Sequence, residues 1–355
     1  MFLAWNEIKN NKLRFTLIVG VLMLISYLLF FLSGLANGLE DMNKEAVDKW
    51  DADGIILTEE SDISLPQSSM RMEDFDGNGA DDYAVLGNFS AIASTDDAKA
   101  NVSIFGIKDN EFIMPELTEG KPFKKTGEVI ANESLKEDGF QIGDKLTLSS
   151  TDVTLSIVGF TDHAKFAAAP VLYSDLKTVQ QIRYGNDIEN YEDQINGIVV
   201  RTDNLEGISV DKDLQVIDTT TFIENLPGYS EQNLTLTLMI YFLFVISAVI
   251  LAIFLYVLTI QKVSIYGVMK AQGISSRYIA NSVIAQTLLL SLAGVLIGLV
   301  LAMITGAFLP AAVPVMFNYG EMLIYGAVLV IVSVLGALFP VRSIVKIDPL
   351  DAIGG

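Results

Sequence analysis

The 355-residue sequence contains no cysteine and a single histidine, His163. The lack of cysteine excludes disulfides, a thiol nucleophile and any thiolate-bound zinc or iron–sulfur site. With one histidine, neither a Ser-His-Asp triad nor a multi-histidine metal site is expected. Basic residues are also scarce, with 23 Lys and Arg against 43 Asp and Glu, and the net charge of −20 makes nucleic acid an unfavourable partner.

Phosphate-binding loops are missing as well. The sequence has no Gly-x-x-x-x-Gly-Lys-Ser/Thr motif and no Gly-x-Gly-x-x-Gly motif that follows a strand. We therefore expect no ATP binding through such a loop and no enzymatic activity of the chain by itself. If the chain takes part in active transport, a partner must supply the energy.

Hydrophobic residues make up 51% of the chain and are concentrated in four runs. A helix of about 20 apolar residues crosses the hydrocarbon core of a bilayer. We place four transmembrane helices at residues 15–36, 234–260, 281–309 and 322–341. Residues 35–233 contain 39 acidic and 15 basic residues, whereas the rest of the chain contains 4 acidic and 8 basic residues.

This uneven charge predicts the membrane topology, because short loops rich in Lys and Arg remain in the cytoplasm. The N-terminal helix 1–14, the loop 261–280 and the tail 342–355 are then cytoplasmic, and the loop 310–321 lies outside. The acidic residues 37–233 form a large extracellular domain. The predicted fold class is a membrane α-helical protein with four transmembrane helices and an α+β domain between helices 1 and 2. We expect it in the plasma membrane, in contact with lipid.

Within the acidic segment, runs of β-branched residues between turn-forming residues predict strands at 128–131, 145–149 and 153–158. A small curled sheet is the expected result. Helices are expected at 40–50, as a continuation of the first span, at 173–184, and at 218–226, where Asp218 or Thr219 is suited to cap the helix.

The loop between the second and third spans has the pattern of a short amphipathic helix on the inner membrane face. Gly273 is suited to end this helix, and Ser275 or Ser276 to cap the next one. An ordinary basic loop that obeys the topology rule is the alternative interpretation. The residues at helical spacing are Val263, Tyr266, Gly267, Lys270 and Ala271.

The same loop carries a family resemblance. The run Gly267-Val-Met-Lys270-Ala-Gln-Gly273 is similar to the Gly-x-x-Lys-Ala-x-Gly pattern of the FtsX-like permease superfamily, and the tail from Asp348 to Ala352 resembles its Asp-Pro-x-x-Ala ending. Four spans with one large domain after the first match its architecture. The chain departs from the pattern where Ser264-Ile-Tyr266 replaces a charged residue, and at Gln272.

Within that superfamily the chain resembles the haem-exporting permeases of Gram-positive bacteria. The resemblance lies in the sequence segments 33–39, 254–262 and 348–355. The resemblance implies a permease homodimer, paired with two cytoplasmic ABC ATPase subunits, that takes haem from the outer leaflet and releases it outside. It also implies that the ATPase acts on the loop helix, through Tyr266, Gly267, Lys270 and Gly273.

Haem iron needs an axial His, Tyr, Met, Cys or carboxylate ligand in an apolar setting. Four candidates lie near the predicted outer membrane face, where they could meet across a dimer interface: Glu40, Met42, Tyr229 and Glu231. Tyr229 is equally suited to anchor the chain at the interface, and Glu231 to cap the second span as a solvated residue. A surface position is the default expectation for His163.

A second candidate site is the acidic run from residue 74 to residue 82. Its oxygen-bearing side chains have the spacing of the first nine positions of a calcium loop, with Gly79 suited to the sharp turn. Val85 occupies the twelfth position instead of Glu, so a complete EF-hand is excluded. A truncated calcium loop and a solvated acidic turn both remain as interpretations. The ligand candidates are Asp74, Asp76, Asn78 and Asp82.

The sequence alone does not identify the transported substrate. The same architecture is suited to export a peptide, a lipid or an antibiotic. It is also suited to mechanical signalling to a cell-wall hydrolase or a sensor kinase. Glycines spaced four apart, at Gly34 and Gly38 and again at Gly294 and Gly298, suit close helix contacts in a dimer or within the chain.

Overall fold

The computed structural model describes residues 9, 12–149, 151–310 and 313–346. It divides into two compact units. The first comprises residues 1–38 and 233–355 and is called the helical unit; the second comprises residues 39–232 and is called the inserted domain. The tail motif that begins at Asp348 lies outside the described residues.

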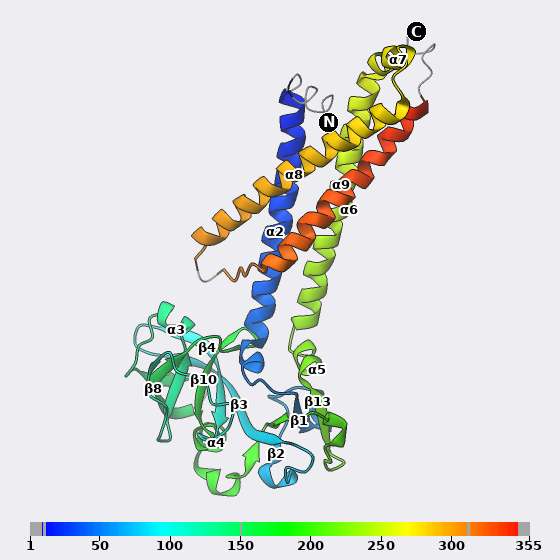
Figure 1. The fold of residues 1–355 in the computed structure, drawn as a ribbon. Coiled ribbons are helices and arrows are strands. Elements are labelled where there is room, and N and C mark those ends of the chain that lie inside the picture. The colour runs from blue at the N-terminus through cyan, green and yellow to red at the C-terminus, as the bar shows by residue number, and fades with distance from the viewer. Residues whose placement is uncertain (1–8, 10–11, 150, 311–312, 347–355) are drawn as a thin grey trace. The chain divides into compact units, whose positions relative to one another are not determined.

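Among the described residues, four long helices each contain an apolar stretch long enough to cross a membrane (Figure 1). The first of them exceeds the predicted span, because 37 residues of helix measure about 55 Å and the hydrocarbon core only about 30 Å. Its last turns belong to the inserted domain, so the helix expected from residue 40 onward is confirmed as a continuation of the first span. The helices are α2 (Lys12–Asp48), α6 (Tyr229–Gln261), α8 (Ser276–Phe308) and α9 (Tyr319–Lys346).

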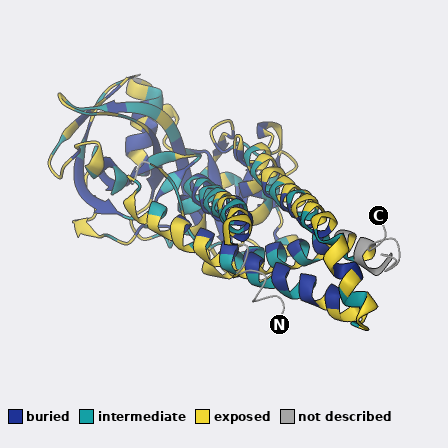
Figure 2. Ribbon diagram, turned by 90° about the horizontal axis from the view of Figure 1, so that it is seen from above, coloured by how far each residue is buried: buried dark blue, intermediate teal, exposed yellow. Residues whose placement is uncertain are grey.

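Side chains from all four helices form the interior of the helical unit, and much of the outer surface stays apolar. Figure 2 shows buried and exposed faces along the same helices. Exposed apolar faces suit lipid contact, and in lipid close packing between helices holds them together. The buried residues are Phe15, Ile18, Leu22, Leu251, Leu255, Leu290 and Ala337 in one cluster, and Ile25, Leu29, Phe30, Val295, Ala302, Met322 and Leu329 in another.

Two glycines of α8 allow it to approach α2 closely. A methyl group on Gly294 would come within 2.6 Å of the Leu22 Cβ, and one on Gly298 within 2.8 Å of the Met23 carbonyl oxygen. The Ser26 hydroxyl donates a hydrogen bond across the contact to the Gly294 carbonyl oxygen, at 3.1 Å. The expected close approach is therefore confirmed here as a contact between helices of one chain.

The other glycine pair packs against a loop. A methyl group on Gly34 would lie 2.6 Å from the Phe317 ring, and Gly38 faces the carbonyl of Pro314. The Met316 amide donates to the Gly34 carbonyl oxygen at 2.8 Å. These glycines therefore seat the described part of the loop before α9 against α2.

The inserted domain is built on an eleven-stranded mixed sheet with the order β13-β1-β12-β3-β4-β10-β6-β8-β5. Because β7 pairs with both β3 and β8, the strands β3, β4, β10, β6, β8 and β7 close into a ring. The strands of the large sheet are β1 (Gly54–Thr58), β3 (Asp82–Ser94), β4 (Lys99–Ile107), β5 (Glu119–Gly120), β6 (Glu128–Asn132), β7 (Lys145–Leu148), β8 (Thr151–Thr161), β9 (Lys165–Phe166), β10 (Ala169–Asp175), β12 (Gly197–Arg201) and β13 (Leu214–Asp218), and a separate pair is formed by β2 (Met70–Arg71) and β11 (Gln194–Ile195).

The three predicted strands are confirmed as β6, β7 and β8, although the sheet is larger than expected. The helix predicted at 218–226 is confirmed as α5 (Thr219–Glu224), with Asp218 as its cap. A further short helix, α3 (Ser134–Glu137), was not predicted. The helix expected at 173–184 begins late, as α4 (Leu176–Tyr184). Residues up to Asp175 instead complete β10, which pairs with β4 and β6.

Aromatic rings join the end of α2 to the sheet. Trp50 is buried, and its ring centroid lies 6.1 Å from those of both Phe105 on β4 and Phe222 on α5. Phe105 in turn packs edge-on against Tyr173 of β10, at 5.7 Å. Trp50, two residues beyond α2, and Ala46 and Val47 on its last turn are therefore part of the core of the inserted domain.

The α2–α8 contact generates a first prediction. We expect Gly298→Ala to lower the free energy of unfolding by about 1–3 kcal/mol, because the new methyl group meets backbone atoms of α2 that must shift. Gly20→Ala on α2 is the matched control. Nothing lies within 4 Å of its new methyl group, and alanine favours helix by up to about 1 kcal/mol. Thermal unfolding in detergent compares the two variants, and equal melting temperatures would contradict the prediction.

Candidate functional site

A short helix, α7 (Val263–Ala271), follows α6 almost immediately. Gly273 has a φ of +88°, a left-handed conformation that ends the helix. The Ser275 hydroxyl then accepts a hydrogen bond from the Tyr278 amide at 3.3 Å and caps α8. The predicted helix, its stop and the next cap are all confirmed as structure; their role in contacting an ATPase stays a prediction.

Two of the four candidate coupling residues are internal. The Tyr266 side chain is only 3% exposed and packs with Ile279 and Val283 of α8, and Gly267 is also buried. These residues therefore hold α7 against the rest of the helical unit and offer little surface to a partner. Lys270 is half-buried and Gly273 is exposed.

The opposite face of α7 presents apolar side chains to the surroundings. Ile265 is 54% exposed and Val268 is 44% exposed, and the exposed Ala271 continues the row. Their spacing of three residues puts them on one face of the helix. The sequence interpretation missed this face because it followed the row through Tyr266; the apolar residues Ile265 and Val268, spaced three apart, were the available signal.

Side chains at this end of the helical unit connect the start of α2 to the end of α6. The Arg14 guanidinium donates to the Gln261 side-chain oxygen at 2.7 Å. The Lys262 ammonium lies 5.8 Å from the centre of the Phe15 ring. A displacement of α7 would therefore also displace the start of α2 and the end of α6.

The structure brings together two of the four haem-ligand candidates within one chain. Tyr229, the first residue of α6, is 7% exposed, and its hydroxyl donates a hydrogen bond to the Glu40 carboxylate on α2. Glu40 also forms an ion pair with Lys44, one helical turn further on, at 3.3 Å. Met42 is half-buried and Glu231 is exposed.

The surroundings of Tyr229 are apolar on one side and charged on the other. Its ring belongs to the same buried cluster as Trp50, Phe222 and Leu226. Its hydroxyl points to the acidic end of α2. Haem ligation by Tyr229, Glu40, Met42 or Glu231 stays a prediction.

The acidic loop directs its carboxylates to its own backbone. Asp74 accepts from the Arg71 amide at 2.7 Å, Asp76 from the Asn78 amide at 3.1 Å, and Asp82 from the Tyr83 amide at 2.9 Å. Gly79 has a φ of +88°, as the predicted turn requires. Calcium binding by Asp74, Asp76, Asn78 and Asp82 stays a prediction.

Lys49, one residue beyond α2, holds the turn after β8. Its ammonium donates to the Thr161 hydroxyl at 2.7 Å, to the Asp162 carbonyl oxygen at 2.7 Å and to the Asp162 carboxylate at 2.9 Å. The hydrogen bond from Lys49 holds the pKa of Asp162 below its ordinary value. His163, the next residue, therefore lies in a turn that the hydrogen bonds of Lys49 hold in place.

A second prediction concerns this turn. A carboxylate with a lowered folded-state pKa stabilises the fold above its unfolded pKa of about 3.9, and this contribution disappears as the pH falls through the folded-state value. We expect Asp162→Asn to lower the melting temperature modestly above about pH 5, and the difference from the unmodified protein to shrink toward about pH 3. Asp152→Asn, at an exposed aspartate of β8, is the matched control. A difference that grows as the pH falls would contradict the prediction.

Comparison with known proteins finds a family match in the helical unit. Residues 237–349, which include α7, α8, α9 and most of α6, match the FtsX-like permease C-terminal family. The chain is 27% identical over 358 residues to a protein of Staphylococcus haemolyticus named "Putative hemin transport system permease protein HrtB", with 100% of this chain and 99% of the relative covered. The corresponding protein of Staphylococcus epidermidis is 27% identical over 365 residues, with the same coverage.

More distant proteins share the full length. An uncharacterized ABC transporter permease of Mycobacterium tuberculosis is 23% identical over 371 residues, with 100% of this chain and 99% of the relative covered. Among solved structures, the extracellular domain of the noncanonic ABC-type transporter YknZ from Gram-positive bacteria is 13% identical, with a TM-score of 0.34, and the match covers 47% of this chain and 99% of that chain. Residues 237–349 therefore match an FtsX-like permease C-terminal region, and the chain as a whole is similar to full-length ABC transporter permeases.

Proposed function

We propose that this permease belongs to an ATP-driven exporter that removes haem from the outer leaflet of the cell membrane. The observation that carries the proposal is the likeness, over the whole chain, to relatives named as hemin transport permeases. The contact between Tyr229 and Glu40 supports it, because it brings together a tyrosine and a carboxylate, two side-chain types that are candidate axial ligands for haem iron. Haem is the substrate in this proposal.

The distribution of charge supports the orientation. Basic residues at the α7 end of the helical unit, among them Arg14, Lys262 and Arg277, favour a cytoplasmic position for that end. The inserted domain would then be extracellular. Tyr229 and Glu40 lie just outside the predicted spans 234–260 and 15–36, so the proposed haem site is at the outer membrane face.

The energy would come from two cytoplasmic ABC ATPase subunits bound to a permease homodimer. Since Tyr266 is internal, we assign the docking contact to the exposed face of α7 with Ile265 and Val268. Helix α6 runs without a break from Tyr229 to Gln261, which is about 50 Å of helix. A push on α7 would therefore be transmitted mechanically along α6 to Tyr229 and its contact with Glu40.

The haem site yields a third prediction. We expect the purified full-length protein to give a Soret band with haem. Tyr229→Phe and Glu40→Gln should each weaken haem binding at least about tenfold, because each removes an oxygen ligand or its charged hydrogen-bond partner. Tyr229→Phe keeps the ring in the core, so folding should be preserved. An absorbance titration measures the affinity.

Tyr83→Phe and Glu60→Gln are the matched controls, because both side chains are exposed in the inserted domain. A protein without a Soret band would exclude haem as the cargo and favour a peptide, lipid or antibiotic, or a signalling role. A Soret band unchanged in both variants would move the search for ligands to Met42 and Glu231.

A fourth prediction tests the docking face. We expect the double variant Ile265→Asp with Val268→Asp to weaken association with the cognate ATPase at least about tenfold, because central apolar contacts contribute about 2 kcal/mol or more to an interface. Both side chains are exposed, so the permease should still fold. Co-purification and ATPase stimulation in lipid vesicles measure the effect.

Ile142→Asp is the matched control, since Ile142 is a 42% exposed apolar residue of the inserted domain. Tyr266→Ala should behave differently and lower the melting temperature, because it removes a buried ring from the α7–α8 contact. Full ATPase association by the double variant would exclude this face as the docking surface.

A further inference from the structure

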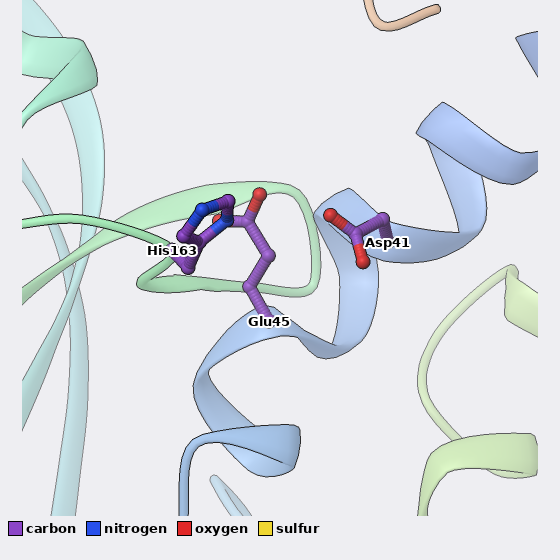
Figure 3. Close-up of side chains that lie close together, drawn as sticks. All are labelled: Asp41, Glu45 and His163. Atoms are coloured by element: carbon purple, nitrogen blue, oxygen red, sulfur yellow. The ribbon is translucent and has the colours of Figure 1, made fainter. Parts of the chain in front are cut away.

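A histidine and two carboxylates from different parts of the inserted domain lie close together. Asp41 and Glu45 are on the last turns of α2, and His163 is in the turn between β8 and β9. One potential ligand atom from each residue lies within 4.8 Å of those of the other two. Figure 3 shows the Glu45 carboxylate beside the His163 ring, with the Asp41 carboxylate directed toward both.

Each of the three side chains has a structural reason for its position. Asp41 and Glu45 are four residues apart on a helix, so both project from one face. The Glu45 carboxylate accepts a hydrogen bond from the Lys165 amide. His163 follows Asp162, which Lys49 anchors. The cluster is therefore assembled by the junction of α2 with the β8–β9 turn.

A buried hydroxyl of the same domain lies within electrostatic range of the cluster. Tyr173 is 1% exposed, and its hydroxyl has no hydrogen-bond partner among the described residues. Burial and the negative charge of Glu45 both raise the pKa of Tyr173, so the ring lies within electrostatic range of that carboxylate. Buried polar groups are nearly always paired, and a water molecule bound to an ion would be a suitable partner.

The charge and exposure of the cluster suit a cation. Asp41 and Glu45 are half-buried and His163 is exposed, so an ion can enter from solvent. Two carboxylates and one imidazole carry two negative charges when the histidine is neutral. One nitrogen and two oxygen ligands suit a first-row divalent ion such as Zn²⁺ better than Ca²⁺, which prefers six or more oxygens.

We propose that Asp41, Glu45 and His163 bind one first-row divalent cation of the Zn²⁺ class, with water in the remaining coordination positions. Ligand bonds of about 2.0–2.2 Å bring ligand atoms closer together than 4.8 Å, so the side chains close around the ion by small rotations. The bound ion cross-links the end of α2 to the β8–β9 turn. It thereby stiffens the connection between the first long helix and the ring of strands.

The full-length protein, treated with a chelator and exchanged into detergent buffer, is titrated with Co²⁺, whose visible absorption reports its ligands and geometry. We expect one Co²⁺ per chain and competition by Zn²⁺. His163→Ala and Glu45→Gln should each weaken binding at least about tenfold. The ion should also raise the melting temperature of the unmodified protein and not that of His163→Ala.

Asp48→Asn is the matched control, because Asp48 lies on the same helix and pairs with Lys44. Asp76→Asn tests whether the acidic loop takes the ion instead. The proposal is overturned if no Co²⁺ binds, if His163→Ala binds it as tightly as the unmodified protein, or if Asp76→Asn removes it.

The metal site stands apart from the haem proposal. Tyr229→Phe should keep Co²⁺ binding while it weakens haem, and His163→Ala should do the reverse. If His163→Ala instead removes the Soret band and leaves Co²⁺ binding intact, His163 belongs to the haem site and the cation proposal is wrong.

Discussion

Within the hydrocarbon of a membrane, every backbone N–H and C=O of α2 and α6 must be hydrogen-bonded inside the protein. Only an unbroken helix or a closed sheet achieves this. Both helices continue past the predicted spans and enter the inserted domain as the same helix. This continuity carries Glu40 and Tyr229 into contact. In our proposal, α6 is also the element that transmits a movement of α7 to Tyr229.

Close packing between the helices has the same origin. Apolar side chains gain little by leaving lipid, so contact distance and shape decide which faces meet. Glycine at positions 294 and 298 lets α8 approach α2 closely enough for the Ser26 hydroxyl to reach the Gly294 carbonyl. The buried Tyr266 has the corresponding role at the other end of α8, where it holds α7 in place.

Much of the secondary structure could be predicted, because it follows from local sequence patterns. Hydropathy runs predicted the four long helices. Helical spacing and Gly273 predicted α7 and its end, and cap residues predicted the starts of α8 and α5. Periodicity did not show which face of α7 is buried, because apolar residues lie on opposite faces of that helix. The start of α4 was predicted too early, since the pairing of β10 with β4 and β6 involves strands far away in the sequence.

The distribution of apolar and charged residues, and the positions of the short helices and strands, follow from the amino-acid sequence. These properties depend on residues close together in the chain, so they can be predicted without the tertiary structure. The contact between Tyr229 and Glu40, and the cluster of His163 with Asp41 and Glu45, could be recognised in the folded chain alone. These contacts join residues far apart in the sequence, so they depend on how the strands and helices pack together.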